Sequence, residues 1–308
     1  MNLGIGIDLG GTTIKAAAFN LDDGNTIAQK TTPTRDGEFV SDGIPAFALG
    51  ISLLLDEFRA QFFTPFTAVG ISAPGIASRD HSCIDFMPNR IHGIEGFDWR
   101  AYLGLSPDLP FTVLNDAHAA LVGELWLGAA KGVDDVAMLT LGTGVGGAII
   151  SGGRLITGHG GRAGHLGHLS LDPDGAPDIC NSPGSLEAAV GNYSITERSA
   201  GRFRSTYELV TALDTGDTQA EHIWENSINA LGAGIVGIIN SLDPELILLG
   251  GGVSKAGQHI TRLLGPYLDK YEWRPGGRQT HIRFATLGEY AGAAGAVHFA
   301  RTDRLTQS

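Results

Sequence analysis

The stretch LGIGIDLGGTTIKAAAF (residues 3–19) opens with an apolar run that leads into Asp8. Gly10 and Gly11 then predict a tight turn, after which the extended apolar run resumes, so the stretch indicates strand, glycine turn and strand. The stretch VAMLTLGTGVGGAIISGGRLITG (residues 136–158) repeats the same order. This repetition indicates two halves of the chain that are built on one plan.

Helical and extended patterns alternate along the rest of the chain. Residues 44–63 carry apolar side chains at helical spacing on more than one face, which predicts a largely covered helix. FTVLNDAHAALVGELWLGAA (residues 111–130) predicts a strand, a break at Asn115 and Asp116, and a helix that one of these two residues caps. Pro244 separates a long helix from a buried strand. Because strands and helices mix throughout, the fold class is α/β.

Composition and charge limit the classes of partner. A chain of 308 residues is long enough for two domains, and 43% apolar and 18% charged residues describe an ordinary globular protein. The formal net charge of -12 argues against nucleic acid as a partner, because a phosphate backbone needs concentrated Lys and Arg. It does not argue against a small phosphorylated ligand, which needs only a few backbone amides and one cation.

Cysteine usage and the apolar runs predict a cytoplasmic protein. Cys83 and Cys180 are too few for a disulfide framework, which favours a reducing compartment. The N-terminal residues MNLGIGIDLGGTT lack the positively charged region of a signal peptide. The longest apolar run (residues 230–239) is bounded by Asn229 and Asn240 and is shorter than a membrane span, so we expect no membrane partner.

Glycine turns follow three apolar strands, and their exposed N–H groups could bind phosphate or border an adenosine. They are DLGGTT (residues 8–13), LGTGVGG (residues 141–147) and LGGGVS (residues 249–254). Any one of them alone is better explained as a hairpin turn. Gly142, Gly144 and Gly147 also match the G-x-G-x-x-G dinucleotide fingerprint, which requires a helix next and an acidic residue about twenty positions later. A β-branched stretch with a Gly-Gly turn follows instead, which excludes the dinucleotide interpretation.

Seven motifs in order resemble the ROK family of bacterial sugar kinases, repressors and open reading frames. They are GIDLGGTTIK, SAPG, NDAHAALVGE, LGTGVGGAII, GRAGHLGH, PGSLE and LGGGVS, and they cover nearly the whole chain. The resemblance implies a two-domain actin/hexokinase-like (ribonuclease H-like) fold with an inter-domain cleft that holds nucleotide and sugar. We expect a first α/β domain of residues 1–117, completed by a C-terminal helix at 289–308, and a second α/β domain of residues 118–288.

The resemblance also implies a nucleotide site made by the three glycine turns. Asp8 would lie close to Mg²⁺, and the turns would contact ATP. The nucleotide-binding positions implied are Gly10, Gly11, Thr12 and Lys15, then Gly142, Thr143 and Gly144, and finally Gly250, Gly251 and Gly252.

Asp116 falls on the catalytic Asp of the family. A carboxylate at the end of a strand suits the task of accepting a proton from a sugar hydroxyl. Asp116 alone would be explained as a helix N-cap, but the seven motifs together favour catalysis. Asn115 would bind sugar hydroxyls beside it, and Asn89 matches another position of the sugar pocket, although a lone Asn after Pro is commonly a turn residue.

GRAGHLGHLSL (residues 161–171) departs from the family pattern G-E-x-G-H, in which Glu and His hold sugar hydroxyls. His168 keeps the pattern, with Glu187 as a second hydroxyl acceptor, whereas His165 replaces the Glu. A neutral imidazole accepts one hydrogen bond and donates one, so the preferred sugar can differ from glucose. The alternative, that His165 packs into the structure, is equally supported.

The family pattern also implies a structural zinc held by this His and three cysteines. Only Cys180 of those cysteines remains, and Asp178 and Ser185 occupy the other two positions. A tetrahedral zinc site needs four suitable N or S ligands. We therefore predict no structural zinc.

The leading hypothesis is an ATP-dependent hexose kinase in which Asp116 acts on the 6-hydroxyl of glucose or a related sugar. One alternative uses polyphosphate as the donor. A second is a regulator, but family repressors carry a DNA-binding domain ahead of the first glycine strand, and this strand begins at about Leu3. A third is a non-catalytic sugar-binding protein, which would not need the phosphate loops. Relatives are often homodimers or tetramers, so a homodimer stays open.

Overall fold

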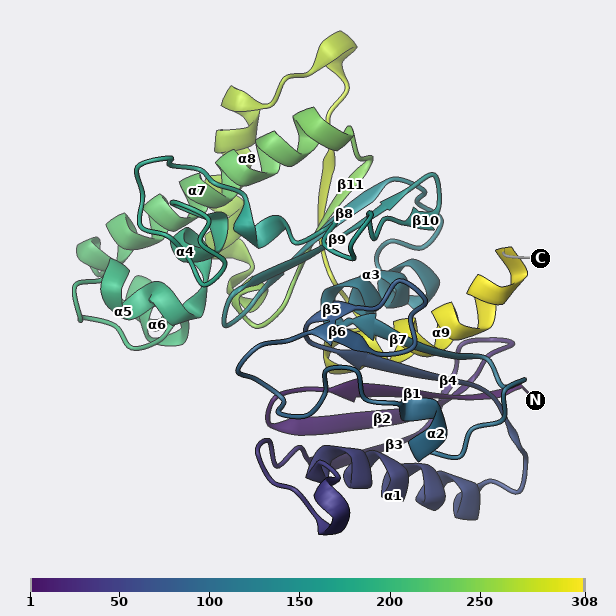
Figure 1. The fold of residues 1–308 in the computed structure, drawn as a ribbon. Coiled ribbons are helices and arrows are strands. Elements are labelled where there is room, and N and C mark those ends of the chain that lie inside the picture. The colour runs from purple at the N-terminus through teal and green to yellow at the C-terminus, as the bar shows by residue number, and fades with distance from the viewer. Residues whose placement is uncertain (1, 307–308) are drawn as a thin grey trace. The chain divides into compact units, whose positions relative to one another are not determined.

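The computed structural model describes residues 2–306 and divides the chain into two compact units. The first unit comprises Met1–Gly132, Thr157–Ala163 and Leu287–Ser308, and the second comprises Val133–Ile156 and Gly164–Thr286. Figure 1 colours the chain from purple at the N-terminus to yellow at the C-terminus. Among the described residues, no helix combines the length and the hydropathy that crossing a membrane would require.

The first unit is built on a sheet in the order β3-β2-β1-β4-β7. Its strands are β1 (Leu3–Leu9), β2 (Thr13–Asn20), β3 (Thr26–Pro33), β4 (Phe66–Ala73) and β7 (Phe111–Asn115). The first three strands are antiparallel, and β4 and β7 continue the sheet parallel to β1. The carboxyl ends of β1, β4 and β7 therefore meet at one edge, where α/β sheets commonly bind ligands.

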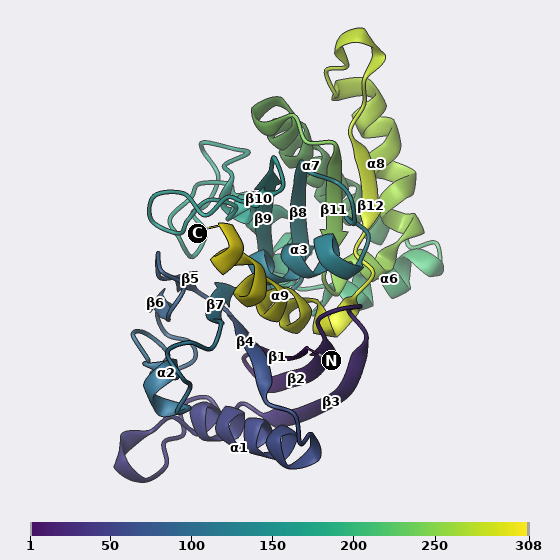
Figure 2. The same cartoon turned by 90° about the vertical axis from the view of Figure 1, so that its right-hand side faces the viewer.

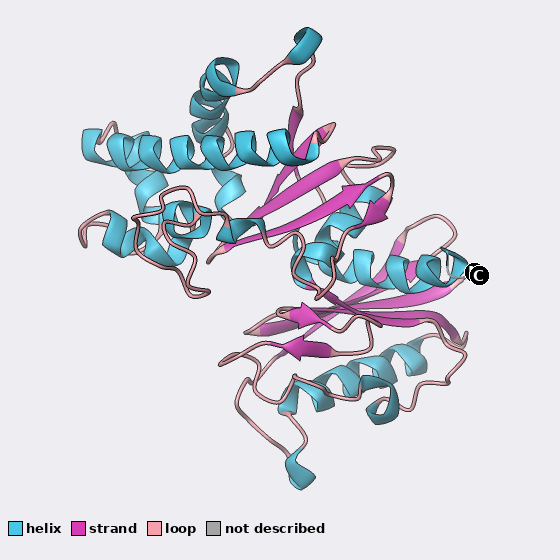
Figure 3. Cartoon of the chain, turned by 45° about the horizontal axis from the view of Figure 1, so that its top comes forward, coloured by secondary structure: helices cyan, strands magenta, loops and turns pink. Residues whose placement is uncertain are grey.

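Helices cover both faces of this sheet (Figures 1 and 3). Helix α1 (Ala46–Gln61) packs on the face that carries Ile5, Ile7 and Ile14. The opposite face carries Ala17 and Phe19 and packs on α9 (Ala291–Thr306), as Figure 2 also shows.

Glycines explain how closely α9 approaches the sheet. A Cβ on Gly6 of β1 would collide with the backbone of Ala293, and one on Gly70 of β4 would collide with Ala296. Helix α3 (Asp116–Leu127) packs in turn on α9, where a Cβ on Gly295 would meet the backbone of Ala119. The smaller elements of this unit are η1 (Ser41–Gly43), β5 (Ile76–Ala77), β6 (Ile84–Phe86), α2 (Trp99–Tyr102) and η6 (Gly288–Tyr290).

The second unit repeats the plan with a sheet in the order β10-β9-β8-β11-β12. Its strands are β8 (Val136–Leu141), β9 (Val145–Ser151), β10 (Arg154–Leu155), β11 (Leu246–Gly250) and β12 (His281–Phe284). In each sheet an antiparallel pair joined by a glycine turn is followed by two parallel strands. The repetition in the sequence thus corresponds to a repetition in the structure.

One hydrophobic core joins this second sheet to its helices. It brings Leu139 of β8 and Ile247 of β11 together with Trp224 and Leu231 of α7 (Thr218–Leu242). The other helical elements of the unit are η2 (Leu166–His168), α4 (Leu186–Val190), η3 (Asn192–Ser194), α5 (Ile195–Arg198), α6 (Thr206–Asp214), η4 (Val253–Ala256), α8 (Gln258–Tyr271) and η5 (Pro275–Gly277).

The predicted helix and helix cap agree with the structure, whereas the predicted domain limits differ from the two compact units. The helix predicted at 44–63 is α1, and Asn115 is the N-cap of α3, accepting hydrogen bonds from Ala117 and His118 N–H. The compact units divide the chain elsewhere than the predicted boundary between residues 117 and 118, which falls inside α3, because the first unit contains this whole helix. Residues 157–163 likewise belong to the first unit. The physical reason is the packing of α3 on α9, which sequence-local patterns do not report.

Candidate functional site

The turn between β1 and β2 is held by a residue that follows β3. The N–H of Gly10 donates to Thr13 O at 3.2 Å, and the Thr34 N–H donates to Thr12 O at 2.9 Å. The Thr34 hydroxyl also donates to Gly10 O at 2.6 Å. Gly11 and Thr12 at the tip are exposed, which keeps their backbone available to a ligand.

Asp8 lies near the end of β1, on the face that packs against α9. Its neighbours in register are Lys15 on β2 and Ser72 on β4, and the Ser72 hydroxyl donates to Asp8 Oδ1 at 2.7 Å. Burial raises the pKa of Asp8 to about 6; the Asp116 charge adds to the rise, and Ser72 and Lys15 oppose it. Lys15 Nζ also pairs with Glu289 Oε2 at 3.1 Å.

The start of α9 packs closely against the Asp8 carboxylate. A Cβ on Gly292 would lie 2.7 Å from Ser72 Oγ and 2.8 Å from Asp8 Oδ1. Real Cβ atoms do not approach so closely, so glycine at this position permits the contact between helix and acid.

Asp116 is the first residue of α3 and directly follows β7. Its side chain is accessible to solvent, but surrounding protein atoms deprive it of hydration and raise the pKa of Asp116. The Ala117 N–H, at 2.8 Å from Oδ1, and the positive charge of Arg90 oppose that rise. The site thus contains two carboxylates, Asp8 and Asp116, close enough for their charges to interact.

Asn115 and Asn89 differ in their surroundings. Asn115 is buried; its Oδ1 caps α3, and its Nδ2 donates to Gly75 O at 2.9 Å. The Asn115 side chain also hydrogen-bonds the Asp116 carboxylate, which opposes the rise in the pKa of Asp116. Asn89 is exposed and has left-handed backbone with φ 61°, which Asn tolerates better than most residues.

Sequence reasoning missed Arg90, the next residue. Its Nη2 lies 3.7 Å from the place that a Cβ on Gly11 would occupy, so the guanidinium lies beside the β1–β2 turn. A cation next to a predicted sugar-pocket residue was the available signal in MPNR. Its proximity to Gly11 depends on how the chain folds.

In the second unit, the β8–β9 turn is held by the segment around α4. The Asn192 and Tyr193 N–H groups donate to Gly142 O and Thr143 O at 3.0 and 2.9 Å. Glu187 Oε2 accepts the Val145 N–H at 2.8 Å, and a Cβ on Gly144 would collide with this carboxylate. Glu187, which the resemblance assigned to the sugar, therefore also supports the predicted phosphate turn.

The third glycine turn leaves the end of β11. Gly251 has φ 83°, and a Cβ there would collide with the backbone of Leu141. Gly250, which ends β11, is buried, whereas Gly252 is exposed and has no atom near its notional Cβ among the described residues. Glycine at 251 is thus required by close packing as well as by conformation.

His165 and His168 lie close to each other at the short helix η2. Their rings are nearly parallel, at 18° with centroids 6.5 Å apart, and both side chains are partly buried. Burial and the neighbouring His168 lower the pKa of His165, which favours a neutral imidazole. His118 is buried, and its Nε2 donates to Ala163 O at 2.9 Å.

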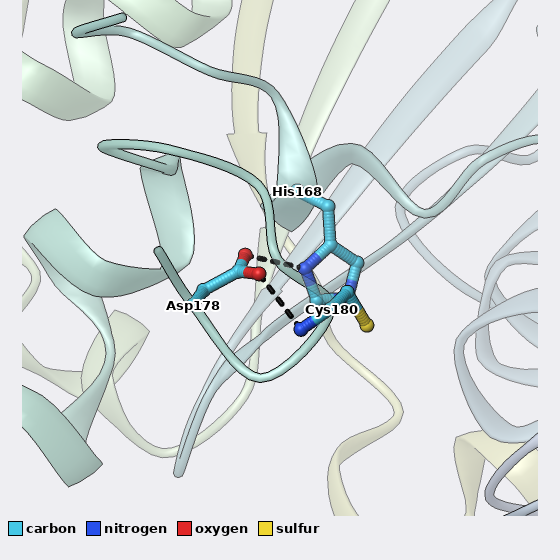
Figure 4. Close-up of side chains that lie close together, drawn as sticks. All are labelled: His168, Asp178 and Cys180. Carbon is cyan, nitrogen blue, oxygen red and sulfur yellow. Dashed lines mark hydrogen bonds and ion pairs between the residues drawn. The ribbon is translucent and has the colours of Figure 1, made fainter. Parts of the chain in front are cut away.

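His168 also belongs to a cluster with Asp178 and Cys180 (Figure 4). His168 Nδ1 donates to Asp178 Oδ2 at 2.7 Å, and Oδ1 accepts the N–H groups of Cys180 and Ser182 at 2.8 and 3.0 Å. The three potential metal-ligating atoms lie within 4.8 Å of one another. Ser185 Oγ instead accepts the Ala188 N–H at 3.2 Å as the N-cap of α4. The carboxylate is thus already satisfied by protein donors.

Residues 4–303 match the sequence profile of the ROK family. The chain belongs to the ROK family. A glucokinase of Halalkalibacterium halodurans is 31% identical over 94% of this chain and 92% of its own length. An N-acetylmannosamine kinase of Escherichia coli O157:H7 is 30% identical over 98% of this chain and 99% of its own.

Solved structures of the ROK family agree with the fold. A ROK hexokinase from Thermus thermophilus superimposes with a TM-score of 0.83 at 29% identity, covering 99% of each chain. A ROK glucokinase from Streptomyces griseus, in complex with glucose and AMPPNP, gives a TM-score of 0.77 at 27% identity, covering 97% of this chain and 99% of its own. The predicted actin/hexokinase-like fold is confirmed, and the chain is a sugar kinase.

Proposed function

We propose that this ROK sugar kinase transfers the γ-phosphoryl group of ATP to a hexose, at the 6-hydroxyl of glucose or a related sugar, with Asp116 as general base. The observation that carries the proposal is the setting of Asp116. It stands at the start of a helix directly after a parallel strand, it is accessible to solvent, and its pKa is raised by desolvation. A base is most effective when its pKa lies near the working pH.

The proposed step balances as follows. The sugar hydroxyl oxygen forms a bond to the γ-phosphorus, and the bond from that phosphorus to the bridging oxygen of ATP breaks, so ADP leaves. The hydroxyl proton passes to the Asp116 carboxylate. The positive charge of Arg90 favours the ionised form of Asp116, which the reaction needs at its start.

The residues of the first unit fit a divalent cation. Asp8 offers carboxylate oxygen, the ligand type that Mg²⁺ prefers, and the Asp116 charge raises the pKa of Asp8. A carboxylate whose ionised form is disfavoured by burial and by a second acid would be stabilised by a bound cation. Bound with ATP, Mg²⁺ would neutralise charge on the phosphate oxygens, and Asp8 would be the residue that holds it.

The glycine turns would bind the nucleotide through backbone N–H groups. The positions proposed for this role are Gly10, Gly11, Thr12 and Lys15, Gly142, Thr143 and Gly144, and Gly250, Gly251 and Gly252. The AMPPNP-bound relative supports ATP as the donor, since its ligand is an ATP analogue.

The sugar would be held by Asn89, Asn115, His165, His168 and Glu187. Asp178 accepts the hydrogen of His168 Nδ1, and His168 Nε2 lies 3.5 Å from Cys180 Sγ, so a sugar hydroxyl would meet Nε2 in place of this thiol. His165 replaces a carboxylate of the family pattern and offers one donor and one acceptor. The glucokinase and N-acetylmannosamine kinase relatives support a hexose or an N-acetylhexosamine.

The test is ADP release from ATP and Mg²⁺ across glucose, mannose, N-acetylglucosamine and N-acetylmannosamine. We expect one sugar to stimulate release, and Asp116→Asn to lower that turnover by about 10²–10⁴-fold, as loss of a general base does. Asp56→Asn on α1 removes the same charge from an exposed side chain of the same unit and should leave turnover unchanged.

Two outcomes would contradict the proposal. Turnover with polyphosphate but not with ATP would overturn the donor. Equal turnover in Asp116→Asn and in wild type would overturn the assignment of the base.

A further inference from the structure

Arg90 lies in a loop with an uncommon backbone conformation. The loop follows β6, and the residues on both sides of Arg90 are left-handed, with φ 61° at Asn89 and φ 48° at Ile91. Asn adopts this conformation readily, whereas a β-branched Ile does so only under strain. Such strain persists where the surrounding structure imposes it, and it is concentrated at functional sites.

Two sets of contacts impose this conformation. The Ile91 side chain is buried in the core of the first unit, at 1% exposure. Asp36 accepts the Ile91 N–H at 3.0 Å with Oδ2 and the His92 N–H at 2.7 Å with Oδ1. The backbone on either side of Arg90 is thus anchored, although the Arg90 side chain itself is exposed.

The guanidinium of Arg90 lies beside two parts of the proposed site. Its Nη2 is 3.7 Å from the place that a Cβ on Gly11 would occupy, at the tip of the β1–β2 turn. Burial raises the pKa of Asp116, and the positive charge of Arg90 opposes that rise. One cation therefore lies near both the predicted phosphate turn and the proposed base.

Phosphoryl transfer needs positive charge at this place. The transferred group spreads its charge over three oxygens, which catalysis must stabilise. Lys15, the cation that the motifs indicated, already pairs with Glu289 at 3.1 Å. A planar guanidinium binds phosphate oxygens in pairs, which an ammonium group does not.

We propose that Arg90 is a further catalytic residue, whose guanidinium contacts the phosphoryl group in transfer to the sugar hydroxyl. The proposal rests on the proposed kinase reaction and adds to it a residue that binds the transferred group.

The loss of Arg90 would also change the charges around Asp116. Its charged neighbours are Asp8 on β1 and Arg90, with the Lys15–Glu289 pair of β2 and η6 beside Asp8. Loss of Arg90 leaves Asp116 facing Asp8 without this opposing charge.

The experiment compares Arg90→Gln and Arg90→Lys with Arg59→Gln, a control on α1 that removes another arginine from the first unit. With the best sugar, Arg90→Gln should lower kcat by about 10²–10³-fold, as loss of one stabilising donor does. The KM for the sugar should change by less than about threefold, because the sugar itself is not contacted. Arg90→Lys should retain more activity than Arg90→Gln, and Arg59→Gln should match wild type.

Binding provides a readout besides turnover. For Arg90→Gln, titration calorimetry should show weaker binding of glucose 6-phosphate by more than about tenfold, with glucose binding unchanged. The acid limb of the kcat/KM profile should move to higher pH, because the pKa of Asp116 rises without the cation.

The outcomes separate this proposal from the proposed function. If wild type shows no sugar-dependent ADP release, the kinase proposal fails and this proposal fails with it. If wild type is active and Arg90→Gln keeps kcat within about twofold, only the role of Arg90 is overturned. Equal weakening of glucose and glucose 6-phosphate binding would also overturn it, since that result means a disturbed pocket.

Discussion

Glu187 Oε2 accepts the backbone N–H of Val145 at 2.8 Å, which ties the start of α4 to the turn between β8 and β9. Glu187 is buried, so the hydrogen bond is shielded from water. A residue that the motifs assigned to the sugar thus also shapes a turn that they assigned to phosphate. Sugar binding and phosphate binding are therefore expected to respond together to changes at Glu187.

Glu187→Ala should weaken the binding of sugar and of ATP and lower the free energy of unfolding. It leaves the buried Val145 N–H without this acceptor, at a cost of about 1–3 kcal/mol in the free energy of unfolding. KM should rise for sugar and for ATP. Urea denaturation and steady-state kinetics measure the two effects, with the exposed Glu225→Ala on α7 as control. A rise in KM for the sugar alone would contradict a shared role.

Asp8→Asn should stabilise the protein at neutral pH and abolish activity. The pKa of Asp8 is raised in the folded state to about 6 from 3.8, so the folded chain holds this proton more tightly than the unfolded chain does. Wild-type stability from this group is present below pH 3.8 and is lost as the pH rises to about 6. At pH 7.5 we expect Asp8→Asn to gain on the order of 1–3 kcal/mol.

Urea denaturation at pH 4 and pH 7.5 tests whether Asp8→Asn raises the free energy of unfolding in this pH-dependent way. The gain over wild type should shrink toward pH 4, where Asp8 of the folded wild type is already protonated. A gain that is equal at both pH values would show that desolvation of the charge is not its source.

Gly292→Ala should disturb the contact between α9 and Asp8. The new Cβ would lie 2.7 Å from Ser72 Oγ and 2.8 Å from Asp8 Oδ1, and relieving the overlap should cost about 1–3 kcal/mol of stability. Gly237→Ala in α7 is the matched control, because no atom lies within 4 Å of its notional Cβ among the described residues. That control should be stabilising by up to about 1 kcal/mol through helix propensity. Equal thermal shifts in the two variants would refute the close contact.

The purified protein should contain no stoichiometric zinc, as the donor set of His168, Asp178 and Cys180 predicts. Elemental analysis should find much less than one zinc per chain, and EDTA should leave the melting temperature unchanged. Cys180→Ser should likewise leave stability unchanged, because the Cys180 side chain is exposed. One tightly bound zinc per chain, lost together with stability in EDTA, would contradict this prediction.

Local sequence determined most of the architecture. Apolar runs that end in Gly10 and Gly11, or in Gly142 and Gly144, predict strands and turns because strand pairing and glycine conformation act over a few residues. Asn115 was recognisable as a cap for the same reason. The ordered motifs then indicated the family and named Asp116.

Tertiary structure alone decided which of these strands, turns and helices contact one another. No residue near Arg90 in the sequence indicates that its guanidinium lies beside Gly11 and that its charge lowers the pKa of Asp116. This proximity arises in the folded chain, where Asp36 anchors the loop after β6. The placement of α3 in the first unit, and the bond from Glu187 to Val145, likewise depend on contacts between distant segments. Periodicity and turn chemistry are short-range, whereas burial and charge interactions are set by the packed chain.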